Sequence, residues 1–224
     1  MNIIKPGNFG ATVPADTRRC EFDIENEELI YLNKSIKYLF IGDSITHYWN
    51  QSAYFSTDGF IVNRGIGGDS SPFLARRFEA DAIQLKPEYI ILLIGINDIL
   101  TTQPDLWWRK PGKDKHEVIS QIKTNLEYII KKCIGIKLSL CSVLPVEICP
   151  PFNREMINNM VLEVNKIIYL LCKQYNLKYV DYHTKMCGSD HKTLRSDLSH
   201  DGVHPNGKGY KIMSQVLTKT IPIA

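Results

Sequence analysis

The chain has 224 residues, 44% of them hydrophobic and 23% charged, and its formal net charge is +3 at pH 7. This length suits one domain with a substantial core, and the balance of apolar and charged residues excludes intrinsic disorder. The basic excess is too small for a nucleic-acid-binding surface, and no apolar run approaches the ~18 residues of a membrane-spanning helix. We therefore expect neither a nucleic-acid partner nor stable membrane insertion.

The amino-terminal segment differs in composition from the rest of the chain. Residues 1–20 are rich in Gly, Pro, Asn and Thr and predict an irregular arm, while residues 21–34 predict a short strand or helix. We expect residues 1–35 to be an arm packed on a single domain of residues 36–224. The arm has no apolar core of signal-peptide length, and the six cysteines lack C-x-x-C spacing, which favours reduced thiols and a cytoplasmic location. A secreted chain trimmed of its signal would have the same sequence.

From residue 38 onward, apolar runs of strand length alternate with longer amphipathic segments. This alternation predicts parallel strands joined by right-handed crossovers, in a three-layer α/β/α arrangement. A long irregular connection, residues 101–115, follows the third run and should lie over the carboxyl edge of the sheet. The candidate strands are 38–41, 60–63, 89–94, 137–143 and 177–181, and the candidate helices are 72–85, 116–132, 154–175 and 206–218.

Three of these strands are followed by residues that suit chemistry. The first strand ends in a tight turn that carries Ser44, the second in a glycine-rich turn that carries Gly68, and the third in a segment that carries Asn97. Open α/β sheets bind ligands outside the carboxyl ends of their strands. If the sheet is parallel, these three residues therefore meet at one edge.

A serine hydroxyl is a weak nucleophile at neutral pH and needs a base that a third group orients. His204 is the candidate base, and Asp201, three residues earlier, can hold its imidazole. Acyl transfer also needs donors for the developing oxyanion. The main-chain amides of Ser44 and Gly68 and the side-chain amide of Asn97 are the candidates for that role.

Four short blocks of the chain, each at a predicted strand end or loop, resemble those of the SGNH (GDSL-type) esterases and acylhydrolases. The blocks stand in the family's order and span residues 42–205. The stretches RGIGGDS and LLIGIND are nearest to the subgroup that resembles the platelet-activating-factor acetylhydrolase catalytic subunits. The blocks are Gly42-Asp43-Ser44-Ile45-Thr46, Gly68 after Asn63, Gly95-Ile96-Asn97-Asp98 and Asp201-Gly202-Val203-His204-Pro205.

The resemblance implies a flavodoxin-like parallel five-stranded sheet in the order 2-1-3-4-5, the SGNH hydrolase fold. It implies a serine acyl-enzyme mechanism without a metal or other cofactor, and a homodimer is plausible on the same ground. By position, it makes Ser44 the nucleophile, Asp201 and His204 the rest of the triad, and Ser44, Gly68 and Asn97 the oxyanion hole. The expected activity is hydrolysis of a small acyl ester, most plausibly acetyl, of a sugar, lipid or metabolite.

Several alternatives stay open at this point. His47 could line the substrate pocket or be a solvated surface residue, and Trp107 and Trp108 could wall a pocket, pack their loop or form a subunit contact. His200 and His204 could suggest a metal pair, but no matching cluster of carboxylates or histidines supports one. A longer acyl slot would make the chain a lysophospholipase or thioesterase, and a third possibility is a non-catalytic binding module on the same fold.

Overall fold

A computed structural model describes residues 3–5, 7, 13–105 and 110–223. Its central feature is one parallel sheet in the order β2-β1-β3-β4-β5. The predicted fold class and strand order are therefore confirmed. The strands are β1 (Ile36–Gly42), β2 (Phe60–Gly65), β3 (Tyr89–Leu93), β4 (Lys137–Cys141) and β5 (Lys178–Val180).

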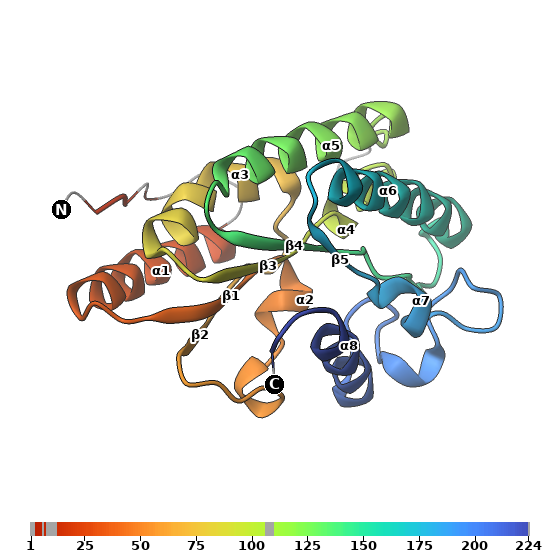
Figure 1. Cartoon of the computed structure of the whole chain (residues 1–224). Helices are drawn as coiled ribbons and strands as arrows, with labels where there is room; N and C mark the ends of the chain where they lie inside the picture. The colour runs from red at the N-terminus through yellow and green to blue at the C-terminus, as the bar shows by residue number, and fades with distance from the viewer. Residues whose placement is uncertain (1–2, 6, 8–12, 106–109, 224) are drawn as a thin grey trace.

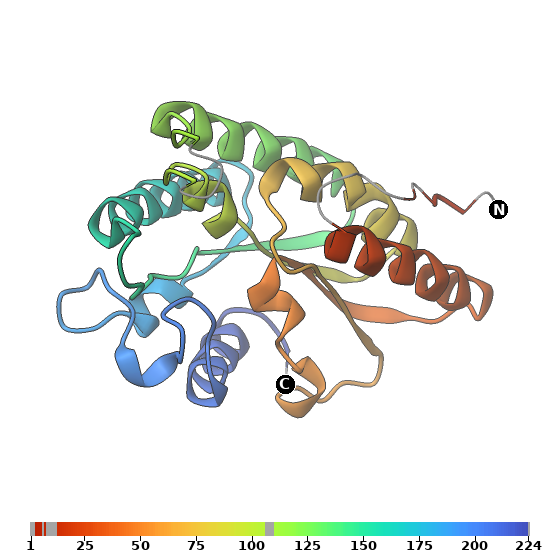
Figure 2. The same ribbon diagram turned by 180° about the vertical axis from the view of Figure 1, so that it is seen from behind.

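Helices cover both faces of the sheet and complete three layers, as Figure 1 and the view from behind in Figure 2 show. One face carries α1 (Val13–Tyr31), α3 (Ser71–Asp81), α5 (Lys115–Lys132) and α6 (Arg154–Gln174). The other face carries α2 (Ser44–His47) and α8 (Gly207–Thr220). The shorter elements are η1 (Gln51–Ala53), η2 (Ile83–Leu85), α4 (Ile96–Leu100), α7 (Tyr182–Met186) and η3 (Ser196–Leu198).

The register of the neighbouring strands β2, β1 and β3 places the ends of these strands side by side. Gly42, at the end of β1, pairs with Gly65 of β2 and with Leu93 of β3. A Cβ atom on Gly42 would lie 2.0 Å from the main-chain oxygen of Leu93, so only glycine fits this close approach of two strands. The turns that follow the three strands consequently leave the sheet at one edge.

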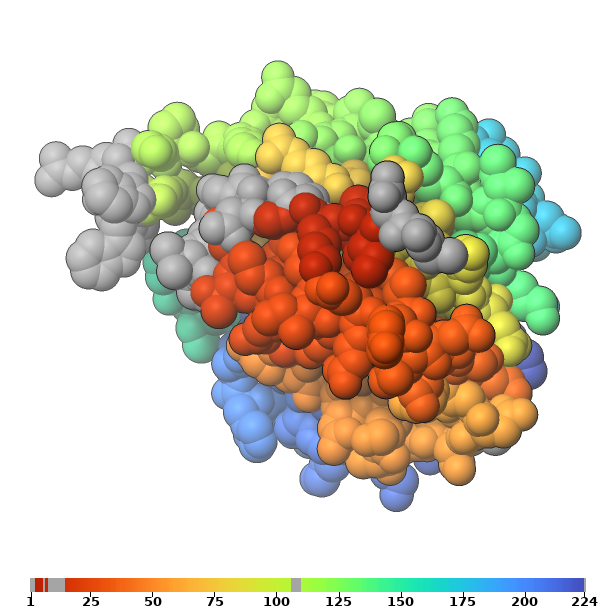
Figure 3. Space-filling model, turned by 90° about the vertical axis from the view of Figure 1, so that its left-hand side faces the viewer, coloured from red at the N-terminus to blue at the C-terminus, as the bar shows by residue number. Residues whose placement is uncertain are grey.

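The amino-terminal segment is more regular than its sequence suggests. The expected irregular arm is wrong for residues 13–20, because α1 begins at Val13 and runs to Tyr31. The buried side of this helix includes Arg19 and Asn26 beside Phe22, so it lacks the apolar periodicity that would have revealed it. Figure 3 shows α1 spread over this side of the molecule.

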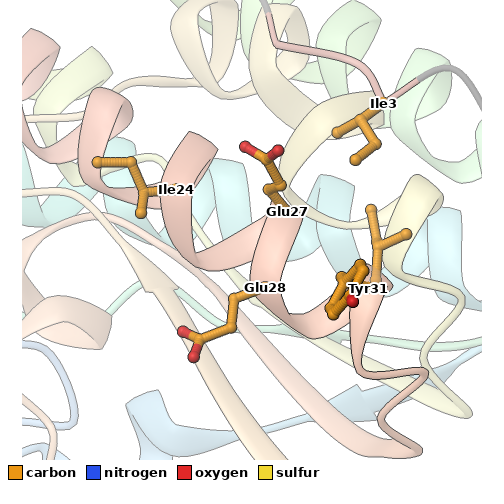
Figure 4. Close-up of a pocket in the computed structure, with 6 residues that line it drawn as sticks. Ile3, Ile24, Glu27, Glu28 and Tyr31 are labelled. Carbon is orange, nitrogen blue, oxygen red and sulfur yellow. The ribbon is translucent and has the colours of Figure 1, made fainter.

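A surface hollow of about 770 Å³ lies along α1, away from the carboxyl edge of the sheet. Figure 4 shows that its labelled lining residues come from α1 and from Ile3. None of the helices within the described ranges is both long and apolar enough to cross a membrane.

Candidate active site

Ser44 is the first residue of α2, and its neighbour Asp43 caps that helix. The backbone of Asp43 is extended, and its carboxylate accepts a hydrogen bond of 2.9 Å from the Ile45 N–H. Aspartate is a favoured N-cap because its side chain satisfies a main-chain donor that the first helical turn leaves unpaired. The cap holds Ser44 at the turn, where the residue is 7% exposed.

The hydroxyl of Ser44 meets the imidazole of His204 at the edge of the sheet. The Ser44 Oγ lies 2.8 Å from His204 Nε2, and His204 Nδ1 lies 2.5 Å from Asp201 Oδ2. A serine is thus in contact with a base, and the base is in contact with a carboxylate. This is the arrangement that serine nucleophiles require.

The loop around Asp201 keeps that carboxylate charged and fixed in position. Asp201 Oδ1 accepts main-chain hydrogen bonds from Val203 at 2.9 Å and His204 at 2.8 Å, and another of 3.1 Å from the Ser199 hydroxyl. Partial burial raises the pKa of Asp201, but the hydrogen bonds from the His204 side chain and from the two main-chain N–H groups outweigh it. The net result is a pKa well below the usual range of a carboxyl.

Gly68 lies in a turn beside the nucleophile. Its φ of +78° belongs to the left-handed region that favours glycine, and the turn is closed by a hydrogen bond of 3.2 Å from the Asp69 N–H to the Ile66 oxygen. A Cβ atom placed on the preceding Gly67 would lie 4.0 Å from the Ser44 Cβ. The glycine-rich turn therefore reaches Ser44, as the sequence predicts.

Asn97 is joined to the same turn. Its Nδ2 donates to the main-chain oxygen of Asp69 at 2.8 Å, which uses one of the two hydrogens of the amide. The adjacent Asp98 accepts from the Ser71 N–H at 2.9 Å and from the Ser71 hydroxyl at 2.6 Å, at the start of α3. Asp98 thus joins α4 to the start of α3, and Asn97 joins α4 to the turn of Gly68.

His47 and Tyr48 form a short aromatic wall next to His204. The rings of His47 and Tyr48 stack with centroids 5.0 Å apart, and the Tyr48 ring meets the His204 ring edge-on at 5.4 Å. Tyr48 is 60% exposed, and its position was missed by sequence reasoning, although an aromatic four residues after the nucleophile was available as a signal. Trp107 and Trp108 lie outside the described residues.

Several ionisable residues close to the site are buried, which the sequence did not indicate. Burial raises the pKa of Asp43 to about 7; the hydrogen bond from Ile45 opposes this rise, and the nearby carboxyls of Asp69 and Asp98 add to it. Burial likewise raises the pKa of Asp98 to about 6, against the hydrogen bonds from Ser71. Among the described residues, no group of three or more His, Cys, Asp or Glu side chains is placed to hold a metal ion.

Comparison with known proteins gives a family match and several similar proteins. A sequence profile described as the GDSL-like Lipase/Acylhydrolase family matches residues 40–212. An acetylxylan esterase from Xylanibacter ruminicola is 27% identical over 175 residues, which cover 72% of this chain and only 33% of that protein. An acetylxylan esterase from Geobacillus stearothermophilus is 23% identical over 165 residues, which cover 72% of this chain and 71% of that protein. Among solved structures, a GDSL-like lipase from Bacteroides thetaiotaomicron has a TM-score of 0.70 and 27% sequence identity. The match covers 89% of this chain and 94% of the lipase.

Proposed function

The chain belongs to the GDSL-like lipase/acylhydrolase family, and we propose that it is a serine esterase that removes a small acyl group, most simply acetyl, through an acyl-enzyme. Membership confirms the resemblance that the four sequence blocks carry. The observation that carries the proposed activity is the contact of one imidazole with two partners, since His204 reaches Ser44 at 2.8 Å and Asp201 at 2.5 Å.

In the first half-reaction, His204 Nε2 takes the proton of Ser44 as the Oγ attacks the ester carbonyl carbon. The Asp201 carboxylate stabilises the imidazolium that forms. The oxyanion accepts hydrogen bonds from the main-chain amides of Ser44 and Gly68 and from the side chain of Asn97. Collapse breaks the bond to the alcohol oxygen, which receives the proton from His204, and the acyl group stays on Ser44.

In the second half-reaction, water replaces the alcohol. His204 takes a proton from the water as its oxygen attacks the acyl-enzyme carbonyl, and the same donors hold the second oxyanion. Collapse returns the proton to the Ser44 oxygen and releases the carboxylic acid. Besides the water, the cycle uses side chains and main-chain amides of this chain.

We propose a carbohydrate as the alcohol part of the substrate. Two relatives are described as acetylxylan esterases, and an exposed aromatic wall adjoins the group that protonates the leaving alcohol. Because His204 must reach the leaving oxygen, the alcohol passes alongside the ring of Tyr48. A flat, partly exposed tyrosine with a polar tip suits a sugar ring, which has both C–H faces and hydroxyl edges.

The substitution Ser44→Ala tests the proposal. We expect kcat on p-nitrophenyl acetate to fall by several orders of magnitude with the fold intact by circular dichroism, because nothing else supplies the nucleophile. Ser52→Ala is the matched control, because the Ser52 hydroxyl is exposed and bonds only to Asn50 within the described contacts. Turnover retained by Ser44→Ala would refute the mechanism.

A series of p-nitrophenyl esters from acetyl to decanoyl tests the acyl preference. The proposal expects the highest kcat/KM for the shortest esters. A maximum at long chains would instead indicate a lysophospholipase or thioesterase, and failure of the wild-type protein to hydrolyse any ester would favour a binding module.

A further inference from the structure

Arg77, in the second turn of α3, is 1% exposed, and each nitrogen of its guanidinium has a hydrogen-bond partner. The Nε donates to Asp69 Oδ2 at 2.8 Å, and Nη2 lies 2.6 Å from the same oxygen and 3.0 Å from the Gly42 oxygen. The Nη1 donates to the Arg64 oxygen at 2.8 Å and to Asp81 Oδ2 at 3.0 Å. Four of these contacts are hydrogen bonds, and the contact between Nη2 and Asp69 is an ion pair.

Two of the acceptors of Arg77, Gly42 and Asp69, adjoin the two turns that build the site, and the other two, Arg64 and Asp81, lie in β2 and α3. Gly42 precedes Ser44 by two residues, and its oxygen also accepts from the Ile66 N–H at 3.0 Å, where the glycine-rich turn begins. Asp69 directly follows Gly68, and its main-chain oxygen holds the Asn97 amide. One side chain therefore ties the nucleophile's turn to the turn of the oxyanion donors.

We propose that Arg77 is a positioning residue, which holds the Ser44 and Gly68 turns in register so that nucleophile and oxyanion donors converge on one carbonyl. This inference rests on the proposed function. Catalytic groups need placement to a fraction of an ångström, and a misplacement of 1 Å can cost about 100-fold in rate. Lysine cannot replace Arg77, because its three donors sit on one nitrogen and cannot span both turns and two carboxylates.

Arg19 offers an internal comparison among the buried ionisable residues. It comes from α1, is also 1% exposed, and forms ion pairs with Asp23 and, at 2.7 Å, with Asp81. Arg19 thus shares Asp81 with Arg77, whereas its ion pairs involve neither turn of the site. A role limited to stability predicts similar consequences for the two arginines, and a positioning role predicts different ones.

The test compares Arg77→Lys with Arg19→Lys in steady-state hydrolysis of p-nitrophenyl acetate, well below either melting temperature. We expect Arg77→Lys to lower kcat by about tenfold or more with KM changed by less than about twofold, as for a misplaced catalytic group. Phosphonylation of Ser44 by a fluorophosphonate should slow in parallel. We expect Arg19→Lys to lower the melting temperature while kcat stays within about twofold of wild type.

If Arg77→Lys does not fold, Asp69→Asn tests the positioning role instead. This variant keeps the shape of the Asp69 side chain and removes its ion pair with Arg77. We expect the same loss of kcat in that variant. Arg77→Lys or Asp69→Asn with wild-type kcat would overturn the inference, and so would an equal loss of kcat in Arg19→Lys. The proposed function fails separately, through an inactive wild type or an active Ser44→Ala variant.

Discussion

The side-chain amide of Asn97 donates to the main-chain oxygen of Asp69 at 2.8 Å, one residue beyond Gly68. Two of the three proposed oxyanion donors, Asn97 and Gly68, are therefore held together by this hydrogen bond. The third, the Ser44 amide, is held by the cap that Asp43 provides to α2. These hydrogen bonds fix the proposed donors before substrate arrives, and such preorganisation makes oxyanion stabilisation effective.

We therefore expect Asn97→Ala to lower kcat on p-nitrophenyl acetate by about 100- to 1,000-fold, the usual cost of one oxyanion donor, with a much smaller change in KM. Asn125→Ala is the control, because Asn125 lies in the same region but donates to the Ser71 hydroxyl, at 3.0 Å, rather than to the turn of Gly68. Equal kinetic losses in the two variants would mean that Asn97 acts only through local structure.

The apolar runs of the sequence predicted most of the strands and helices of the fold. The predicted strand 89–94 differs from β3 (Tyr89–Leu93) by one residue, because a strand buried on both faces leaves a continuous apolar run. The predicted helix 154–175 likewise ends one residue beyond α6 (Arg154–Gln174). The start of α1 was missed, and residues 21–34 stayed open between strand and helix, since the buried side of α1 includes arginine and asparagine. Their burial depends on partners in α3 that no local pattern reveals.

The site, too, has residues that a local sequence pattern reveals and a residue that it does not. Ser44, Gly68 and Asn97 could be placed together because parallel strands align their carboxyl ends, and His204 is recognised by its spacing from Asp201 although 160 residues separate it from Ser44. Arg77 could not be recognised. It stands next to Arg76 in an amphipathic helix, and only the folded chain distinguishes the buried arginine from its exposed neighbour.

Asp201→Asn should lower kcat by about 100-fold or more, because an amide cannot stabilise the imidazolium and favours the wrong tautomer of His204. The main-chain hydrogen bonds to Oδ1 persist in this variant, so the melting temperature should change little. Asp197→Asn is the control, since Asp197 is exposed and pairs with Arg195. Activity near wild type in Asp201→Asn would remove Asp201 from the mechanism.

The buried Asp43 predicts a pH-dependent stability. Because burial raises its folded-state pKa to about 7, above the ordinary value of 3.8, the folded protein binds this proton more tightly than the unfolded chain. This contribution is fully present below about pH 4 and is lost as pH rises towards 7, at roughly 1 kcal/mol per pH unit. Asp43→Asn should therefore gain free energy of unfolding relative to wild type between pH 5 and pH 7.

Urea denaturation of both proteins at pH 5, 6, 7 and 8 measures this difference. Asp58→Asn serves as the control, because Asp58 is exposed and the Lys37 side chain lowers its pKa, so it stays charged throughout. A difference between wild type and Asp43→Asn that does not change with pH would show that Asp43 is not neutral at pH 5.

Tyr48→Ala should raise KM for an acetylated xylooligosaccharide by about fivefold, equivalent to the ~1 kcal/mol of an aromatic contact. Hydrolysis of ethyl acetate should change by less than about twofold, which checks that His204 has not moved. Tyr48→Phe should resemble wild type if the ring face makes the contact. Tyr31→Ala is the control, because Tyr31 is 86% exposed on α1. Equal effects on both substrates would contradict a sugar contact.

The central claim is that Ser44 becomes covalently acylated with His204 as its base. Reaction of the folded protein with a fluorophosphonate, followed by mass spectrometry of its peptides, tests that claim most directly. We expect one adduct, on Ser44, absent from Ser44→Ala and formed at least about 100-fold more slowly in His204→Ala. An ester-hydrolysing wild-type protein that carries no adduct, or carries it on another residue, would contradict the account.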